Sequence, residues 1–281
     1  MEKLRNHLEA GLTIEQTRNL LGLRVHKIRE HDLMALALDN ASKNKGGVIT
    51  YANAFTLWLA QRQPEFAATL NCCDLCYPDG VGVALTSLLL GHGNMPKTTA
   101  NRFFLELCHR AAQLRLSLAL LGGKPGVATQ VAATIRDRIL CPVSLAAADG
   151  YQTSTEFCKT IEYFRQFAPK LIFLGMGQPR QEETALRLHV ALPGSTILCV
   201  GGLFDVIAGV LPNCPAVLRE AGLEWFFRLI TRPQRVWRRY LLGIPGLAIS
   251  IAGERYKTSR LNQWLQNQPP RTPSTENEKG G

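Results

Sequence analysis

Residues 117–139 read SLALLGGKPGVATQVAATIRDRI, and this stretch decides the fold. It begins with a continuous apolar run (117–121), passes through a glycine-rich turn (122–126, GGKPG) and continues in a helical pattern (127–139). A strand that is apolar on both sides is typical of a parallel sheet covered by helices on both faces. The order strand, glycine turn, helix therefore predicts one unit of a parallel α/β sheet.

The same alternation extends over most of the chain. Five more strand-like runs occur at 47–51 (GVITY), 72–77, 143–147, 171–175 (LIFLG) and 196–200 (TILCV), and helical patterns include 100–113 and 181–189. Helices of this length between strands imply right-handed crossovers. We therefore predict an α/β fold, a Rossmann-like and mostly parallel sheet with helices on both faces and a C-terminal helical appendage.

Composition divides the chain into four parts. Residues 1–22 are expected to form a helical extension and residues 23–220 the α/β core. Residues 221–265 show no strand signals, only amphipathic patterns rich in arginine and tryptophan, and predict a helical appendage that associates with a membrane. Residues 266–281 are rich in proline, serine and charge, so we expect a disordered tail.

Charge and cysteine content limit the class of protein. The net charge of +10 favours anionic partners, while residues 1–16 lack the apolar segment of a signal peptide and no apolar run reaches the length of a membrane span. The eight cysteines lie mostly in apolar runs, as buried reduced thiols do. Cys73 and Cys76 form a C-x-x-C without a second pair or a nearby histidine, which disfavours a zinc or redox site.

Polar and glycine-rich residues follow the predicted strands, where open parallel sheets bind ligands. They are Thr50 and Asn53, Asp79 in a Pro-Asp-Gly turn, Gly122 and Gly123, Gln181, and Gly201, Gly202 and Asp205. We expect these turns to converge on one pocket. Glycine turns before helices suit an anion, although glycine after a strand is also an ordinary tight turn.

Asp79 is the candidate general base of this pocket. A Pro-Asp-Gly turn by itself predicts only a turn aspartate. Its position beyond a buried strand, opposite the glycine loops, favours a role in accepting a proton from a hydroxyl. Because GGKPG is not the spaced G-x-G-x-x-G fingerprint, a nicotinamide site is disfavoured, but Asp149 could still hold a ribose hydroxyl, so this alternative stays open.

Cations of the appendage could meet the charge of a diphosphate. The chain has no D-x-D pair and no histidine spacing typical of a metal site, so fixed positive charge would replace a metal. Arg228, Arg235 and Arg238 share one helical face if the helix is unbroken, but Pro233 could break it. The same arginines, mixed with aromatic residues, suit equally a phospholipid-facing surface, a core or an oligomer contact.

Together, seven motifs resemble the WecG/TagA/CpsF glycosyltransferases, which build bacterial surface polysaccharides. The resemblance covers roughly residues 22–245. Its motifs are ITYANAFTLWLA (49–60), PDGVGV (78–83), LLGGKPGVA (120–128), FLGMGQPRQE (173–182), GGLFDVIAG (201–209), LEWFFRL (223–229) and RPQRVWRRY (232–240).

The resemblance implies an inverting, metal-independent transfer that needs no cofactor. The donor would be a UDP-sugar carrying N-acetylmannosamine, its uronic acid or glucose, and the acceptor a polyprenyl-diphosphate-linked sugar. Such an enzyme would be cytoplasmic and peripheral on the inner face of the cell membrane, with no nucleic-acid partner. Homo-oligomerisation is left open.

The resemblance also assigns roles to residues. Asp79 would be the base, Thr50 and Asn53 would face the sugar, Gln181 would lie in the donor pocket, and Arg228, Arg235 and Arg238 would close over the diphosphate. The sequence departs from the family at Lys97, where relatives carry an arginine. A lysine there cannot donate two parallel hydrogen bonds as a guanidinium does. Further departures at Phe55 and at residues 213–215 (NCP) leave the donor sugar undetermined.

Two other functions remain open on the sequence alone. One is a nicotinamide-dependent oxidoreductase on a similar doubly wound sheet. The other is a non-catalytic basic module that docks on anionic lipid or nucleic acid, although no base-stacking motif supports nucleic acid.

Overall fold

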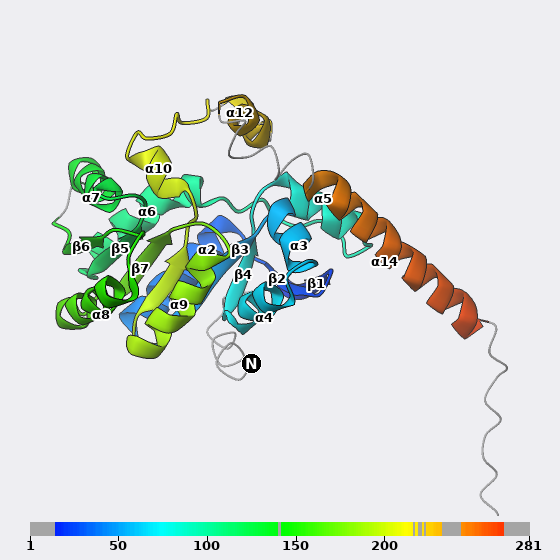
Figure 1. Ribbon diagram of the computed structural model, residues 1–281, viewed down its shortest axis with the longest axis horizontal. Helices are drawn as coiled ribbons and strands as arrows, with labels where there is room; N and C mark the ends of the chain where they lie inside the picture. Colours follow the sequence, from blue (N-terminus) through cyan, green and yellow to red (C-terminus); the bar gives the residue numbers. More distant parts are fainter. Residues whose placement is uncertain are drawn as a thin grey trace, which may run out of the picture.

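A parallel sheet of six strands forms the centre of the protein (Figure 1). The computed structural model describes residues 15–139, 142–215, 217–218, 221, 223–231 and 243–266. The strand order is β4–β3–β8–β7–β5–β6. Their bounds are β3 (Gly47–Ala52), β4 (Leu75–Pro78), β5 (Leu118–Gly122), β6 (Leu145–Ala148), β7 (Leu171–Gly175) and β8 (Thr196–Cys199). Each overlaps one of the six predicted strands, which confirms the α/β fold.

Helices cover both faces of this sheet (Figure 1). Right-handed crossovers place α3 (Ala54–Ala60), α4 (Pro64–Cys72), α8 (Ser154–Phe167) and α9 (Arg180–Ala191) on one face. The other face carries α2 (Glu30–Ser42), α6 (Ala100–Gln113) and α7 (Val127–Arg138), and α5 (Val81–Leu89) and α10 (Leu203–Ile207) follow β4 and β8. Because strands β3, β4, β5, β7 and β8 are buried along their whole length, both faces contribute to the core.

The N-terminal region corrects one prediction. Residues 15–22 are not helical, because β1 (Glu15–Leu20) pairs antiparallel with β2 (Leu23–Lys27). Leu21 and Gly22 both have positive φ, 54° and 87°, which gives the two-residue turn that joins hairpin strands. The predicted helix over residues 1–14 lies outside the described residues.

The C-terminal helices are α12 (Glu224–Thr231) and α14 (Gly243–Gln266), so the described parts of residues 221–265 are mostly helical. The first turns of α14 pack on α3, where Leu247 and Ile251 are buried. Gly246 permits this contact, because a Cβ there would lie 2.3 Å from Nε1 of Trp58. Beyond residue 251 the helix projects from the body of the protein (Figure 1). The predicted tail lies, except for Gln266 at the end of α14, outside the described residues.

Within the part of the chain that the structure describes, no helix combines the length and the apolar character needed to span a bilayer.

Candidate active site

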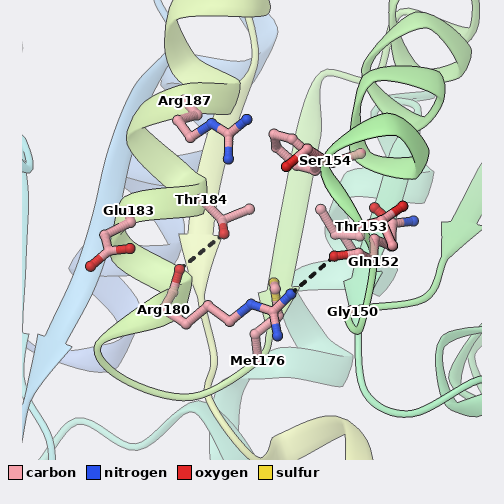
Figure 2. Close-up of a pocket in the computed structure, with 11 residues that line it drawn as sticks. Gly150, Gln152, Thr153, Ser154, Met176, Arg180, Glu183, Thr184 and Arg187 are labelled. Atoms are coloured by element: carbon pink, nitrogen blue, oxygen red, sulfur yellow. Dashed lines mark hydrogen bonds between the residues drawn. The ribbon is translucent and has the colours of Figure 1, made fainter.

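A cleft opens where the sheet changes direction. From β5 the chain turns to α7 on one face, whereas from the neighbouring β7 it turns to α9 on the other, so the ends of these strands diverge as at a topological switch point. The cleft has a volume of about 220 Å³ and lies between α8 and α9 (Figure 2). Its lining includes Gly150, Gln152, Thr153, Met176, Arg180 and Arg187.

Two arginines of α9 line the cleft. The guanidinium of Arg180 donates a 3.5 Å hydrogen bond to the carbonyl of Gln152 (Figure 2). It also lies over the ring of Tyr151, 5.5 Å from the ring centroid. One face of the same helix also carries Arg187, whose guanidinium lies 4.5 Å from the centroid of Phe157. The side-chain oxygen of Gln152 is buried and has no hydrogen-bond partner among the described residues. Positive charge, an aromatic surface and a spare acceptor thus meet in one cleft, a combination suited to a nucleotide.

Glycines let the strand ends beside the cleft pack backbone to backbone. A Cβ on Gly122 would lie 2.5 Å from the carbonyl oxygen of Gly175, and one on Gly150 would lie 2.8 Å from Cα of Gly122. The N–H of Gly123 donates to the same Gly175 carbonyl at 2.9 Å. The loop from Gly122 to Gly126 is therefore held rigidly over the ends of β5 and β7.

Asp149 secures the other end of this loop. Its Oδ1 accepts a 2.9 Å hydrogen bond from the N–H of Gly126, at the start of α7. The carboxylate that could have held a ribose hydroxyl thus fixes the glycine loop, which weakens the nicotinamide alternative.

A buried glutamate joins the ends of several elements. Oε1 of Glu182 accepts hydrogen bonds from Oγ1 of Thr50 (2.9 Å), from Nε2 of Gln178 (3.0 Å) and from Nε2 of Gln181 (2.8 Å). Its Oε2 has no partner among the described residues. Burial raises the pKa of Glu182 to about 7, although the three hydrogen bonds oppose the rise.

The partners of Glu182 hold the turns after β3 and β8. Oε1 of Gln181 accepts a 3.0 Å hydrogen bond from the N–H of Gly201. Nε2 of Gln178 also donates to the carbonyl of Tyr51 at 2.9 Å, and its Oε1 accepts from Thr56 in the first turn of α3. The network therefore fixes two strand-end turns relative to α9.

Two residues expected to contact the substrates are buried beneath the strand-end turns. Thr50 and Gln181 are both fully buried, and their polar side-chain atoms bond to Glu182 and Gly201. The cause is strand alternation: Thr50 lies opposite Cys76 in the β3–β4 register and points toward the face covered by α9. The next residue, Tyr51, points the other way, and a Cβ on Gly201 would lie 2.3 Å from its hydroxyl. As placed, Thr50 and Gln181 support the turns.

Asp79 lies beside Asn53 at the edge of the sheet. The N–H of Asp79 donates a 2.7 Å hydrogen bond to the carbonyl of Ala52, and a Cβ on Gly82 would lie 2.6 Å from Cβ of Ala54, so the two turns pack tightly. The side chain of Asn53 caps α3 by accepting from the N–H of Thr56 at 3.0 Å. Asp79 itself is half-buried, which leaves its carboxylate within reach of solvent.

The charge of Asp79 acts on Tyr77, a buried phenol that contacts the end of β8. Burial and then the charge of Asp79 raise the pKa of the Tyr77 phenol, and that phenol donates a 3.4 Å hydrogen bond to the carbonyl of Cys199.

The remaining predicted residues lie along the same edge or on α12. Lys97 is half-buried beside the Asp79 turn, since the next residue, Thr98, donates from its N–H to the carbonyl of Pro78 at 3.0 Å. Gly202 is exposed at the start of α10, which also carries the partly exposed Asp205. Arg228 is half-buried on α12, whereas Arg235 and Arg238 lie outside the described residues.

Cys73 and Cys76 are free thiols in the core, and burial raises the pKa of each. Across the described ranges, no group of three or more histidine, cysteine, aspartate or glutamate side chains is arranged to hold a metal ion.

Sequence reasoning missed the cleft arginines and the glutamate network. A signal for Arg180 and Arg187 was present, because residues seven apart on a helix share a face. Glu182 ends the motif FLGMGQPRQE, but local sequence could not indicate its hydrogen bond to Thr50, which is 132 positions away.

The parallel sheet with a cleft at its switch point is a Rossmann-like fold, and the comparison with protein families shows a glycosyltransferase. The model of the "Glycosyl transferase WecG/TagA/CpsF family" matches residues 18–261, and the chain belongs to this family.

Two similar proteins are each named N-acetylglucosaminyldiphosphoundecaprenol N-acetyl-beta-D-mannosaminyltransferase. The protein of Bacillus spizizenii (strain W23) is 28% identical over 210 residues, which cover 74% of this chain and 80% of the relative. The protein of Bacillus subtilis (strain 168) is 29% identical over 210 residues, with the same two coverages.

Proposed function

We propose that this glycosyltransferase moves N-acetylmannosamine, or a closely related sugar, from a UDP-sugar to a polyprenyl-diphosphate-linked acceptor in the synthesis of a bacterial surface polysaccharide. The observation that carries the proposal is the half-buried Asp79 beside Asn53, on the edge of the sheet that also holds the glycine turns. The names of the two relatives support both the sugar and the lipid-linked acceptor.

The nucleoside of the donor fits the cleft between α8 and α9. Arg180, Arg187 and Gln152 line this cleft. The planar guanidinium groups of the two arginines and the side-chain oxygen of Gln152, unpaired among the described residues, offer stacking and hydrogen bonding to a uracil or a ribose. The donor diphosphate would then extend over the turns at Gly122–Gly123 and Gly201–Gly202, beside the N-terminal end of α7, whose dipole favours an anion.

The chemistry is a single displacement at the anomeric carbon. Asp79 takes the proton of the acceptor hydroxyl, the oxygen bonds to the anomeric carbon, and the bond from that carbon to the UDP oxygen breaks. Attack from the side opposite UDP inverts the configuration. The negative charge that develops on UDP is met by cations, for which Lys97 and Arg228 are the described candidates and Arg235 and Arg238 the others. This scheme requires no metal ion.

The acceptor lipid places the reaction at a membrane surface. A chain with a net charge of +10 is attracted to anionic lipid, which is consistent with a cytoplasmic enzyme bound peripherally to the inner face of the membrane. The structure described here is of one chain, and self-association is not required by the scheme.

A donor screen tests the proposal. The purified chain is incubated with UDP-N-acetylmannosamine, its uronic acid or UDP-glucose, each with a short-chain prenyl-diphosphate-linked N-acetylglucosamine and with EDTA. We expect UDP release and an elongated product, fastest with UDP-N-acetylmannosamine and with inverted configuration. Absence of transfer from every UDP-sugar, together with tight binding of NADH in a fluorescence titration, would favour the oxidoreductase alternative.

A further inference from the structure

Helix α5 buries its two polar side chains and exposes four of its apolar side chains. Thr86 and Ser87 are buried and bond to the carbonyls of Gly82 and Gly93, both at 2.8 Å. Leu85 and Leu88 are instead 56% and 60% exposed. A helix on the surface of a soluble protein normally shows the opposite arrangement, so its outer face is suited to an apolar environment.

The exposed apolar side chains form one stripe. Val81, Leu85, Leu88 and Leu89 are all at least 39% exposed and follow the spacing i, i+4, i+7 and i+8, which places them on one face. The stripe begins two residues after Asp79. An apolar partner of this face would therefore lie next to the proposed catalytic carboxylate.

One basic side chain lies near the C-terminal end of α5, and another lies over the neighbouring helix α3. The guanidinium of Arg18 donates from Nε to the carbonyl of His92, whose N–H is bonded to Ser87 near the C-terminal end of α5. Arg62 is exposed and lies over the ring of Trp58 on α3, which contacts α5. Apolar side chains flanked by cations match the interface of an anionic bilayer, where apolar groups enter the acyl region and cations meet phosphates.

The size of the stripe argues against a second protein chain. Stable protein interfaces bury roughly 800 Å² on each partner. Four partly exposed side chains on a nine-residue helix, about 13 Å long, cannot supply that area.

We propose that the outer face of α5 inserts into the surface of an anionic lipid bilayer and so brings Asp79 to the diphosphate end of the lipid-linked acceptor. The inference rests on the proposed function for its acceptor, but the contact between α5 and lipid can be tested without turnover.

The test compares vesicle binding by three proteins. They are the full-length wild-type chain, the double variant Leu85→Gln/Leu88→Gln, and the control Val190→Gln, which changes an apolar residue of α9 that is 82% exposed. Flotation with vesicles of phosphatidylglycerol and phosphatidylethanolamine measures the partition of each protein. Glutamine keeps helix propensity and adds no charge. Thermal unfolding verifies that each variant is folded, and Leu88→Gln alone replaces the double variant if the latter is not.

We expect the double variant to partition at least about tenfold more weakly than wild type, because two leucine side chains leave the lipid, and the control to match wild type. Transfer to a water-soluble short-chain acceptor should be unchanged, while transfer to a long-chain acceptor in vesicles should fall with the partition.

Equal partition of the double variant and wild type, or no vesicle binding by wild type, would overturn the inference. The inference would also be overturned if wild type were a dimer and the double variant were a monomer that still binds vesicles. A second copy of the chain would then occupy the stripe. If flotation depends on α5 but no sugar is transferred to either acceptor, only the proposed function fails.

Discussion

Oγ1 of Thr50 donates a 2.9 Å hydrogen bond to Oε1 of Glu182 in the interior of the protein. The bond connects β3 to α9, on which Gln181 holds the turn at Gly201. The position of the turns at the edge of the sheet thus depends on the buried carboxyl group of Glu182. The protonation of this group should be visible in the stability of the protein.

The stability of the protein should depend on pH through Glu182. Its pKa is about 7 in the folded protein and 4.5 as a model value, so the folded state binds the proton more tightly. Its contribution to stability is fully present below about pH 4.5 and is lost as the pH rises through about 7. Glu182→Gln cannot ionise. From pH 5 to pH 8, the free energy of unfolding of wild type should fall by about 2–3 kcal/mol relative to that of the variant.

Urea unfolding of both proteins at several pH values measures this difference. Curves of free energy against pH that run parallel for wild type and Glu182→Gln would mean that Glu182 is ionised in the folded protein throughout.

The glycine contact between β5 and β7 should be essential for stability. Gly122→Ala places a methyl group 2.5 Å from the backbone of Gly175, which cannot move aside easily, so we expect a loss of about 1–3 kcal/mol in urea unfolding. Gly202→Ala is the matched control, because a Cβ there meets nothing within 4 Å and φ is −75°. Its stability should stay within about 0.5 kcal/mol of wild type. Equal stabilities of the two variants would contradict the close packing of the strand ends.

The cleft should bind the donor through Arg180. Arg180→Lys keeps the charge but loses the planar group that lies over Tyr151, so KM for the UDP-sugar should rise about tenfold with little change in kcat. Arg165→Lys, on the exposed side of α8, should leave both constants unchanged. Steady-state kinetics with varied donor measures both. An unchanged KM in Arg180→Lys would place the nucleoside elsewhere.

Local sequence predicted the fold because each strand is a continuous apolar run of its own. The bounds of β7 (Leu171–Gly175) and α6 (Ala100–Gln113) agree with prediction to the residue. The start of β4 does not, because α4 extends through Cys72 into the run predicted as strand. The N-terminal hairpin was missed because only its two-residue turn, Leu21–Gly22, indicates a hairpin. The segment before this turn has a pattern that is also typical of a helix.

The site was predictable only at the level of strand ends. The rule that ligands bind beyond parallel strands pointed to Asp79 and Asn53, which the structure places side by side. The rule could not predict that the side chain of Thr50 points into the interior, whereas the turn after it lies at the edge of the sheet. That distinction depends on the position of α9 over β3, and the two elements are far apart in the chain.

The most direct test of the proposed chemistry is the turnover of Asp79→Asn. An amide cannot take the proton of the acceptor hydroxyl, whereas the backbone bond from residue 79 to Ala52 and the fold are retained. We expect kcat for transfer from the UDP-sugar to a short-chain lipid-linked acceptor to fall by about 10²–10⁴, with little change in KM for the donor. Asp137→Asn, an exposed change on α7, should behave as wild type. Turnover of Asp79→Asn within about threefold of wild type would show that Asp79 is not the base.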